Sequence, residues 1–372
     1  MKKSRFIVML AVMAVYAVLS PLGAKESRDA KYSVVMLGDT HFDTEPASVY
    51  HSNYNEPVEW LNRVQRAEFA RNGEMWRERC PRLLKRAAKL VTPDTRMALQ
   101  MGDLIQGDCG NGEVHRKMLD DVLNNFKAAL GGLPLVTVVG NHDIRGVDAY
   151  DVYEEYMPQR MSQELNRTID NTTFAFTIGP DAFIVINFND PEDDVIEKLL
   201  DETKDARYTF IITHGPVLPF DDSSCRWFLY GGRDQTLERL HFRKLFARRN
   251  AIVLCGHVHS TEFADWWGDG GRITQMTMNS VWAKDKQGQY EVVAQGAAQY
   301  GERRKTIKAA DNGSKLKDET PLFDEYRAGL REYSQSFAAG SYKLNVSDKK
   351  VTIDFYAGDS KTVTKTFVLR SK

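Results

Sequence analysis

The sequence predicts an α/β fold in which two mixed β-sheets pack face to face and helices cover their outer faces, an α-β-β-α sandwich. Three observations support this class. Five short apolar runs of β-forming residues are spread over the first two thirds of the 372-residue chain, between segments of helical pattern. Aspartate, asparagine or histidine stands two residues after the end of every run. The end of the chain alternates apolar and polar side chains, which is typical of antiparallel strands.

The five apolar runs are expected to be strands of these sheets. They occupy residues 32–37, 97–101, 135–139, 208–212 and 251–255. A further strand pair is expected at 174–178 and 183–188. Helices are predicted at residues 58–90, 113–130, 194–203, 234–248 and 321–333, the first with a break at Asn72-Gly73 or at Cys80-Pro81. Residues 301–320 are charged and contain Asn312-Gly313, so we expect an exposed loop there.

Three C-terminal strands are expected to complete one of the sheets. Tyr342, Leu344 and Val346 share one face of the first of these strands. No motif with metal-ligating side chains lies between residues 301 and 372. We therefore interpret residues 340–372 as strands of the same domain, which spans residues 30–372. A small separate C-terminal β-domain is the alternative.

Residues 1–24 have the pattern of a secretory signal peptide. Lys2, Lys3 and Arg5 precede an uninterrupted apolar run of 14 residues, 6–19, and a helix-breaking segment ends at Ala24. A helix of that run would be about 21 Å long, short of the roughly 30 Å of a bilayer core. We expect cleavage after Ala24, export to the periplasm or the exterior, and no stable membrane span afterwards. An uncleaved anchor and a buried helix are the alternatives.

The charge balance does not favour a nucleic-acid partner. The formal net charge is −1 at pH 7, and loss of residues 1–24 would make it more negative by three. The basic stretch 58–90 has few interleaved aromatic residues, so we interpret it as a solvated helix face.

The four cysteines leave the redox state open. An even number in an exported protein permits two disulfides, whereas Cys255, at the end of an apolar strand, has the pattern of a buried thiol. The others are Cys80, Cys109 and Cys225.

Each of the five apolar runs ends in a short motif with metal-ligating side chains. Aspartate, asparagine and histidine supply oxygen and nitrogen ligands for hard and borderline divalent metals. Because the carboxyl ends of parallel strands meet at one edge of a sheet, we expect the motifs to converge on a two-metal site. Five of the eight histidines fall inside the motifs, which scattered histidines would not do. The motifs are Gly38-Asp39-Thr40-His41, Gly102-Asp103, Gly140-Asn141-His142-Asp143, Thr213-His214-Gly215 and Gly256-His257-Val258-His259.

In content and order these motifs resemble those of the calcineurin-like metallophosphoesterases, over roughly residues 32–290. The resemblance implies two divalent metal ions, Mn, Zn or Fe, bridged by Asp103 because a carboxylate has two oxygens. It also implies attack of a metal-bridging hydroxide on a phosphate mono- or diester, since coordination lowers the pKa of water. One metal would be held by Asp39, His41, Asp103 and His259, and the other by Asp103, Asn141, His214 and His257.

The resemblance further implies that His142 binds no metal and protonates the leaving group as a general acid. Many members of the family orient this histidine with an aspartate three residues after the bridging aspartate, where this sequence has Gln106. Asp108 and Asp143 are the candidates to replace that aspartate. Purple acid phosphatases carry a tyrosine ligand at the same offset, so Gln106 argues against a charge-transfer iron site.

Loops after the strands are expected to line the substrate pocket. Arg145 and Arg226 are the candidates to bind a phosphate group, although a structural salt bridge is at least an equal alternative for each. Aromatic residues on these loops either stack a base or a sugar, or pack in the core; they include Phe220, Trp227, Trp266 and Trp267.

The sequence therefore predicts an exported, dinuclear metal-dependent phosphoric ester hydrolase that acts on a small phosphorylated substrate, with no nucleic acid as a partner. Three alternatives remain: a nuclease of the same family, a non-catalytic scaffold or binding protein with this fold, and a surface carbohydrate- or protein-binding module. The charge disfavours the first. A scaffold would be expected to have lost ligands, and the binding module would not account for the ligand set.

Overall fold

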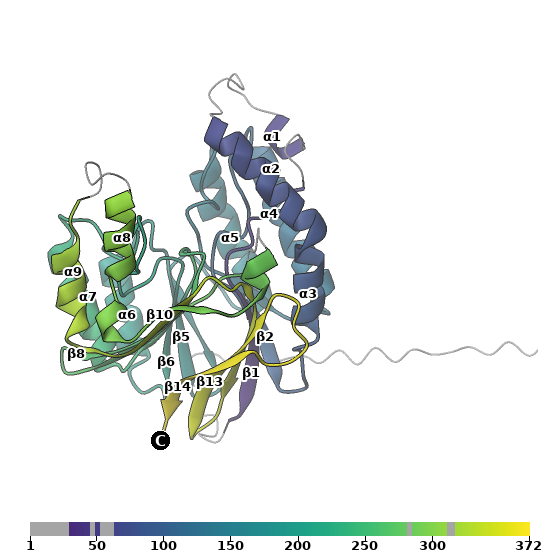
Figure 1. The fold of residues 1–372 in the computed structure, drawn as a ribbon. Helices are drawn as coiled ribbons and strands as arrows, with labels where there is room; N and C mark the ends of the chain where they lie inside the picture. The colour runs from purple at the N-terminus through teal and green to yellow at the C-terminus, as the bar shows by residue number, and fades with distance from the viewer. Residues whose placement is uncertain (1–29, 45–48, 53–62, 281–284, 311–316) are drawn as a thin grey trace, which may run out of the picture.

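The computed structural model describes residues 30–44, 49–52, 63–280, 285–310 and 317–372. Two β-sheets lie at the centre with helices on their outer sides, which confirms the predicted fold class (Figure 1). The sheets share one apolar core, in which Tyr32 of one sheet approaches Phe183 of the other. The predicted signal peptide, residues 1–24, lies outside the described residues. None of the described helices is long and apolar enough to span a bilayer.

The first sheet joins the N-terminal and C-terminal parts of the chain. Its strand order is β14-β13-β12-β1-β2-β3. The strands β1, β2 and β3 are parallel, and β12 pairs antiparallel with β1, with Leu344 opposite Val34. The C-terminal strands therefore complete this sheet. Their bounds are β1 Tyr32–Leu37, β2 Thr95–Gln100, β3 Leu135–Thr137, β12 Gly340–Val346, β13 Lys350–Ala357 and β14 Lys365–Ser371.

The second sheet has the order β10-β11-β8-β9-β7-β6-β5-β4. The strands β5, β6, β7 and β9 are parallel, and antiparallel strands flank them on both sides. The bounds are β4 Phe174–Ile178, β5 Asp181–Ile186, β6 Thr209–Thr213, β7 Ile252–Cys255, β8 Thr261–Gly268, β9 Gly271–Thr277, β10 Val292–Gln295 and β11 Leu330–Ser336.

Helices cover the outer face of each sheet, so the central strands are buried on both sides and read as continuous apolar runs. All residues of β1, β5 and β6 are buried. The first sheet is covered by α3 Cys80–Ala88, α4 Gly112–Ala129 and α5 Ala149–Leu165, with α1 Val49–Ser52 and α2 Arg63–Glu78 beside them. The second is covered by α6 Asp193–Glu202 and α7 Thr236–Arg248, with α8 Glu302–Ala310, α9 Thr320–Arg327 and the 3-10 turns Asp285–Gly288 and Ala297–Gln299 nearby.

The break in the long basic helix falls at Cys80-Pro81 and not at Asn72-Gly73. Proline has no backbone N–H to donate within a helix, and in the first turn of a new helix that N–H has no partner in any case. Pro81 accordingly stands at the start of α3.

Two expectations about the last third of the chain are wrong. Residues 301–320 are not simply a loop, because α8 occupies Glu302–Ala310 and the Asp221 carboxylate accepts the backbone N–H groups of Arg303 and Arg304 at 2.9 and 2.6 Å. The helix predicted for 321–333 ends at Arg327, and β11 follows because β8 offers it a partner strand. Both outcomes depend on contacts distant in the sequence.

The four cysteines are free, buried thiols. Burial raises the pKa of the Cys225 thiol to about 11 and that of the other three further. Of the two alternatives for the cysteines, the structure therefore has buried free thiols and not disulfides.

Candidate metal centre

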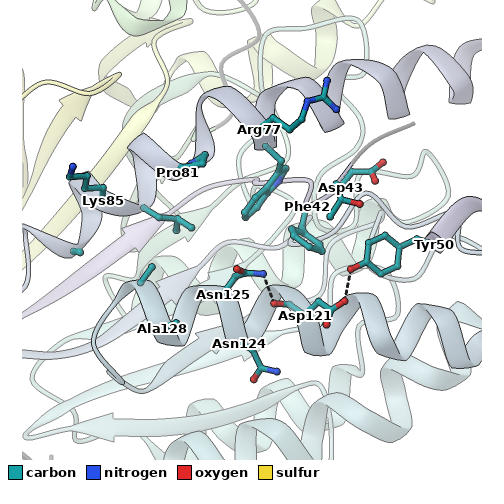
Figure 2. Close-up of a pocket in the computed structure, with 15 residues that line it drawn as sticks. Phe42, Asp43, Tyr50, Arg77, Pro81, Lys85, Asp121, Asn124, Asn125 and Ala128 are labelled. Atoms are coloured by element: carbon teal, nitrogen blue, oxygen red, sulfur yellow. Dashed lines mark hydrogen bonds between the residues drawn. The ribbon is translucent and has the colours of Figure 1, made fainter. Parts of the chain in front are cut away.

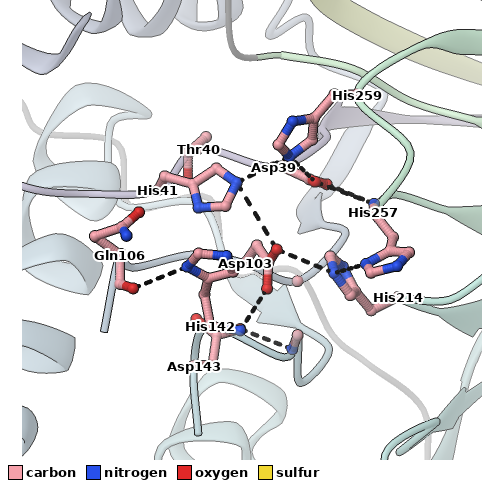
Figure 3. A network of polar contacts seen from close by, with 12 residues as sticks. Asp39, Thr40, His41, Asp103, Gln106, His142, Asp143, His214, His257 and His259 are labelled. Carbon is pink, nitrogen blue, oxygen red and sulfur yellow. Dashed lines mark hydrogen bonds and ion pairs between the residues drawn. The ribbon is translucent and has the colours of Figure 1, made fainter. Parts of the chain in front are cut away.

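Six aspartate and histidine side chains converge where the two sheets adjoin, at the carboxyl ends of parallel strands (Figure 3). They belong to the segments that follow β1, β2, β6 and β7. The backbone holds these segments together: Asp39 bridges to Asn279 after β9, and Phe42 bridges to Ile105. The predicted convergence therefore takes place across two sheets.

The first ligand set consists of Asp39, His41, Asp103 and His259, whose ligand atoms all lie within 4.8 Å of one another. His259 Nε2 is 3.0 Å from Asp39 Oδ2 and also 3.0 Å from His41 Nε2. Two imidazole nitrogens and a carboxylate oxygen thus point at a common centre, as the donors of a metal site do.

The second set consists of Asp103, His214 and His257. His214 Nε2 lies 3.3 Å from Asp103 Oδ2 and 3.2 Å from His257 Nδ1. Since Asp103 Oδ2 is also 3.7 Å from His41 Nε2, one carboxylate oxygen belongs to both sets. His214 donates its other ring nitrogen, Nδ1, to the Met101 carbonyl at 2.6 Å, which turns Nε2 toward the set.

Asn141 follows β3 in the loop that packs on Asp103. Its side-chain oxygen Oδ1 is buried and has no hydrogen-bond partner within the described residues. A buried amide oxygen without a partner is costly, and a bound cation would satisfy it. The neighbouring backbone N–H, that of His142, donates to Asp103 Oδ1 at 2.8 Å.

The backbone of the ligand loops is held in an unfavourable conformation. His41, Asp103, His257 and His259 have φ values of 44°, 48°, 72° and 53°. Non-glycine residues rarely adopt this left-handed region, at a cost of order 1 kcal/mol each, and such residues cluster at functional sites. These loops therefore adopt backbone conformations that are locally unfavourable but that hold the ligand atoms together.

Glycines allow these loops to approach one another. A Cβ at Gly140 would lie 2.0 Å from the backbone nitrogen of Asp103, and one at Gly256 would lie 2.3 Å from Asp39 Oδ1. The glycines in the Gly-Asn-His-Asp and Gly-His-Val-His motifs are thus required by packing against the ligand of another motif.

The charges of the site are strongly coupled. Burial alone would raise the pKa of Asp103, but His214, His142 and His41 hold it well below its ordinary value. Burial would lower the pKa of His214, yet Asp103 raises it to about 9. Burial, with the charge of His214, lowers the pKa of His257 to about 3. Without a cation, a proton on His214 balances the shared carboxylate, so metal binding would release protons.

His142 is oriented by a backbone carbonyl. Its Nδ1 donates to the Gln106 carbonyl at 2.9 Å, and its Nε2 lies 3.4 Å from an Arg145 nitrogen. Neither Asp108 nor Asp143 takes the predicted role: Asp108 pairs with Arg145 at 2.6 Å, and Asp143 accepts backbone N–H groups of Ile105 and Gly140. A carbonyl is present at every residue, so no side-chain signal could have identified it.

The two arginines proposed to bind substrate lie in different surroundings. Arg145 is beside His142, paired with Asp108 and with Glu68 at 2.9 Å. Arg226 donates to Glu319 at 2.7 Å and to the Gly231 carbonyl, and not to a metal-ligand side chain within the described residues.

Aromatic rings surround His257. Trp227 stacks parallel to the imidazole with centroids 5.7 Å apart and is 57% exposed. Phe188 and Phe220 pack against the same ring at 5.7 and 6.0 Å. Trp266, in contrast, is a core residue that packs on Tyr326.

The helix α2 also contributes to the centre, which the sequence did not reveal because its arginines resemble those of a solvated helix face. Trp76 Nε1 donates to the carbonyl of Thr40, beside His41, at 2.7 Å. Glu68 and Asn72 contact the Gln106 side chain. Their spacing of four residues places them on one helix face, and that spacing is the only sequence signal they carry.

A separate cavity of about 970 Å³ lies between α2, α3 and α4 (Figure 2). Phe42 and Trp76 line it, with Arg77 and Lys85 above and Asp121 and Asn125 below. None of the metal-ligand side chains borders it.

Comparison of this chain with known proteins identifies a matching family. The model of the calcineurin-like phosphoesterase family matches residues 32–261, more than half of the chain. Among curated proteins no match is found. In fold, the chain is similar to the structure of PhoD, at 11% identity and a TM-score of 0.50, over 94% of this chain and 74% of that one.

Two further solved structures are similar. One is titled GAP50, the anchor in the inner membrane complex of Plasmodium, at 14% identity, a TM-score of 0.48 and coverage of 92% and 89%. The other is a dimetal phosphatase from Danio rerio, at 10% identity, a TM-score of 0.47 and coverage of 92% and 99%. Because the family model covers most of the motif-bearing core, the chain belongs to the calcineurin-like phosphoesterase family.

Proposed function

We propose that the protein is a dinuclear metal-dependent hydrolase of phosphate mono- or diesters. The observation that carries the proposal is the position of Asp103 Oδ2, 3.3 Å from His214 Nε2 and 3.7 Å from His41 Nε2. A carboxylate that belongs to both ligand sets can bridge a pair of metal ions.

The donor set fits two divalent ions such as Mn, Zn or Fe(II). Asp39, His41, Asp103 and His259 would hold one, and Asp103, Asn141, His214 and His257 the other. Imidazole, carboxylate and amide donors suit these ions, and the unpartnered Asn141 oxygen adds a neutral ligand where an anion has to bind. When bound, the pair would supply an activated water and stabilise negative charge on the phosphoryl oxygens.

His142 is the proposed general acid. Because Nδ1 is occupied by the Gln106 carbonyl, Nε2 is the nitrogen that can exchange a proton with a leaving group. Burial and the nearby Arg145 charge lower the pKa of His142, and the Asp103 charge opposes this shift. Arg145 is fixed by Asp108 and Glu68, and it faces substrate through the nitrogen close to His142.

The substrate is proposed to be a small phosphorylated molecule, and the protein is proposed to act outside the cytoplasm. The support for export is residues 1–24 alone, with their basic start and apolar run. Mass spectrometry of the protein from culture medium and cell-envelope fractions tests it: a chain that begins after Ala24 supports export, and an intact N-terminus in the cytoplasmic fraction contradicts it.

Turnover and metal content of purified protein test the catalytic proposal. We expect about two metal ions per chain, and hydrolysis of p-nitrophenyl phosphate or bis(p-nitrophenyl) phosphate that chelation abolishes and Mn or Zn restores. A protein that binds metal but hydrolyses no member of a broad panel of phosphate esters would instead be a scaffold with this fold. Strong binding to DNA or RNA with cleavage would favour the nuclease alternative.

A further inference from the structure

Trp227 is exposed in a loop whose other aromatic residues are buried. The loop, residues 214–235, joins β6 to α7. Its remaining aromatic residues pack in the core of the second sheet and are at most 5% exposed; they are Phe220, Phe228 and Tyr230. Trp227, in contrast, is 57% exposed. Core packing therefore does not account for the position of its indole.

Two contacts fix the segment that carries Trp227. The backbone N–H of Trp227 donates to the Ser224 carbonyl at 2.8 Å. The side chain of Arg226, the preceding residue, donates to Glu319 at 2.7 Å. This arginine therefore anchors the loop, and the indole beside it is held in place by the protein itself.

One face of the indole lies on a candidate metal ligand. The ring is nearly parallel to the imidazole of His257, with an interplanar angle of 12° and centroids 5.7 Å apart. Because the planes of stacked rings are about 3.5 Å apart, this pair is offset, and part of the indole extends past the imidazole. Within the described part of the chain, no second ring or cation stacks on Trp227. The indole therefore presents a free aromatic face at the edge of the metal centre.

We propose that Trp227 is a substrate-binding residue that stacks a planar aromatic ring of the phosphate ester, and that the substrates are nucleotides. The proposal rests on the proposed function of the metal centre and extends it to a substrate class. Every nucleobase has an aromatic face, and stacking on a tryptophan is favourable whichever base is present. Trp227 would thus favour nucleotides as a class and not one particular base.

The position of the indole favours a ring that is carried on a spacer. A ring stacked on its free face would lie about 7 Å from the plane of the His257 imidazole, which is two stacking distances. A phosphoryl group held by the metal ions would lie near the ligand atoms in that plane. An ester oxygen alone does not span this gap, whereas the ribose between the base and the phosphate of a nucleotide does.

Trp227→Ala, with Trp267→Ala as its matched control, tests the proposal. Trp267 is 48% exposed, stands near the opposite end of β8 from His259, and has the Arg272 guanidinium 5.4 Å from its ring centroid. It therefore offers a similarly exposed indole that is remote from the metal ligands.

The first readout is the binding of the hydrolysis-resistant methylenephosphonate analogue of adenosine monophosphate (AMP) to the metal-loaded proteins. Calorimetry measures its affinity, and quenching of indole fluorescence reports the stack itself. We expect W227A to bind the analogue about 10-fold more weakly and to lose most of the quenching, W227F to lie between it and the parent, and W267A to match the parent. Inorganic phosphate has no ring, so its affinity should be unchanged in W227A, and elemental analysis should find the same metal content.

The second readout is kcat/KM for AMP, phenyl phosphate and glycerol phosphate. W227A should lose about 10-fold on AMP, mainly through KM. The loss should be smaller on phenyl phosphate, whose ring is attached directly to the ester oxygen, and absent on glycerol phosphate, which has no ring. Comparing variant and parent on the same ester cancels the different reactivities of the leaving groups.

The outcomes separate the two proposals. Equal affinity of W227A and W267A for the analogue overturns the role of Trp227 even if the esters are hydrolysed. So does an equal loss on the analogue and on phosphate, or a loss of metal, because the indole would then only support His257. A loss on phenyl phosphate as large as that on AMP overturns the nucleotide class. If the parent hydrolyses neither these esters nor bis(p-nitrophenyl) phosphate, but W227A weakens binding of the analogue and not of phosphate, the proposed catalysis fails and the binding role stands.

Discussion

The metal-ligand loops and the helix α2 build the same site by different means. The loops are continuous with central strands, and backbone conformation and glycine contacts fix their ligand atoms. The helix is attached by side-chain hydrogen bonds to the outer edge, such as those of Trp76 and Asn72. The candidate metal ligands thus belong to segments continuous with the sheets, and α2 borders them as a separate element.

This difference predicts how strongly substitutions in the loops and in α2 affect the site. Moving a ligand loop requires rearranging strands buried on both faces, which costs core packing. Detaching α2 would break hydrogen bonds of about 1 kcal/mol each and expose the buried Phe69, Met75 and Trp76, but a single polar substitution on the helix removes only one such bond. We therefore expect substitutions in the loops to abolish activity and substitutions in α2 to alter substrate affinity.

The largest effect is expected from Asp103→Ala. Loss of the oxygen shared by both ligand sets should remove metal and reduce hydrolysis about 10³-fold or more. Elemental analysis and ester hydrolysis measure the two effects. Asp324→Ala, at an exposed ion pair on α9, is the control. Full activity of D103A would contradict the dinuclear centre.

His142→Ala should reduce kcat by about 10²- to 10⁴-fold while the metal content stays the same, because the residue is expected to move a proton and not to bind metal. Substrates with good leaving groups should be affected least. The exposed His241→Ala, which loses a surface pair with Glu197 and an edge contact with Phe242, serves as control. Parallel loss of metal would make His142 a ligand.

A substitution at Glu262 tests how much stability is lost by burying a charged carboxylate beside the ligand loops. Burial raises its pKa to about 7, against the hydrogen bonds that Ser260 and Gln335 donate. Because the folded state holds the proton more tightly than the unfolded chain, this contribution is present below the ordinary glutamate pKa and is lost as the pH rises through about 7. Glu262→Gln should therefore be more stable than the parent at pH 8, by about 1–3 kcal/mol, and nearly equal at pH 5. Urea unfolding at both pH values measures this difference, with the exposed Glu332→Gln as control; a pH-independent difference would contradict it.

The smallest effect is expected from Asn72→Ala, which removes a hydrogen bond between α2 and the Gln106 side chain and leaves every candidate metal ligand in place. KM should rise a few-fold, kcat should stay within about 2-fold, and stability should fall by about 1 kcal/mol. Steady-state kinetics and thermal unfolding measure these changes. Asn124→Ala, at an exposed position on α4 beside the separate cavity, should change neither. A fall in kcat equal to that of H142A would place Asn72 in the reaction itself.

Much of the scaffold was predictable because its signals are local. Apolar runs that end in Asp, Asn or His marked the strands and the ligand segments, and Asp39, Asp103 and His214 lie together as expected. The C-terminal alternation marked strands that do complete a sheet. In contrast, the start of β11 lies within the segment predicted as helix 321–333, because its strand identity depends on β8, which is distant in the sequence.

The features of the site that could not be predicted depend on contacts between segments that are distant in the sequence. Gln106 stands where many family members have a carboxylate, yet its carbonyl orients His142 and its side-chain amide contacts α2. Trp76 carries no sequence signal of its own, and only the packing of α2 brings its indole to the loop of His41.

The sequence by itself determined the fold class, the ligand types and the strand ends at which they stand, because periodicity and motif composition are properties of short segments. Only the tertiary structure decided that one oxygen of Asp103 is shared by two ligand sets, that a carbonyl orients His142, and which arginines are neutralised. These features are distances between atoms far apart in the chain, and they exist only once both sheets and α2 have packed.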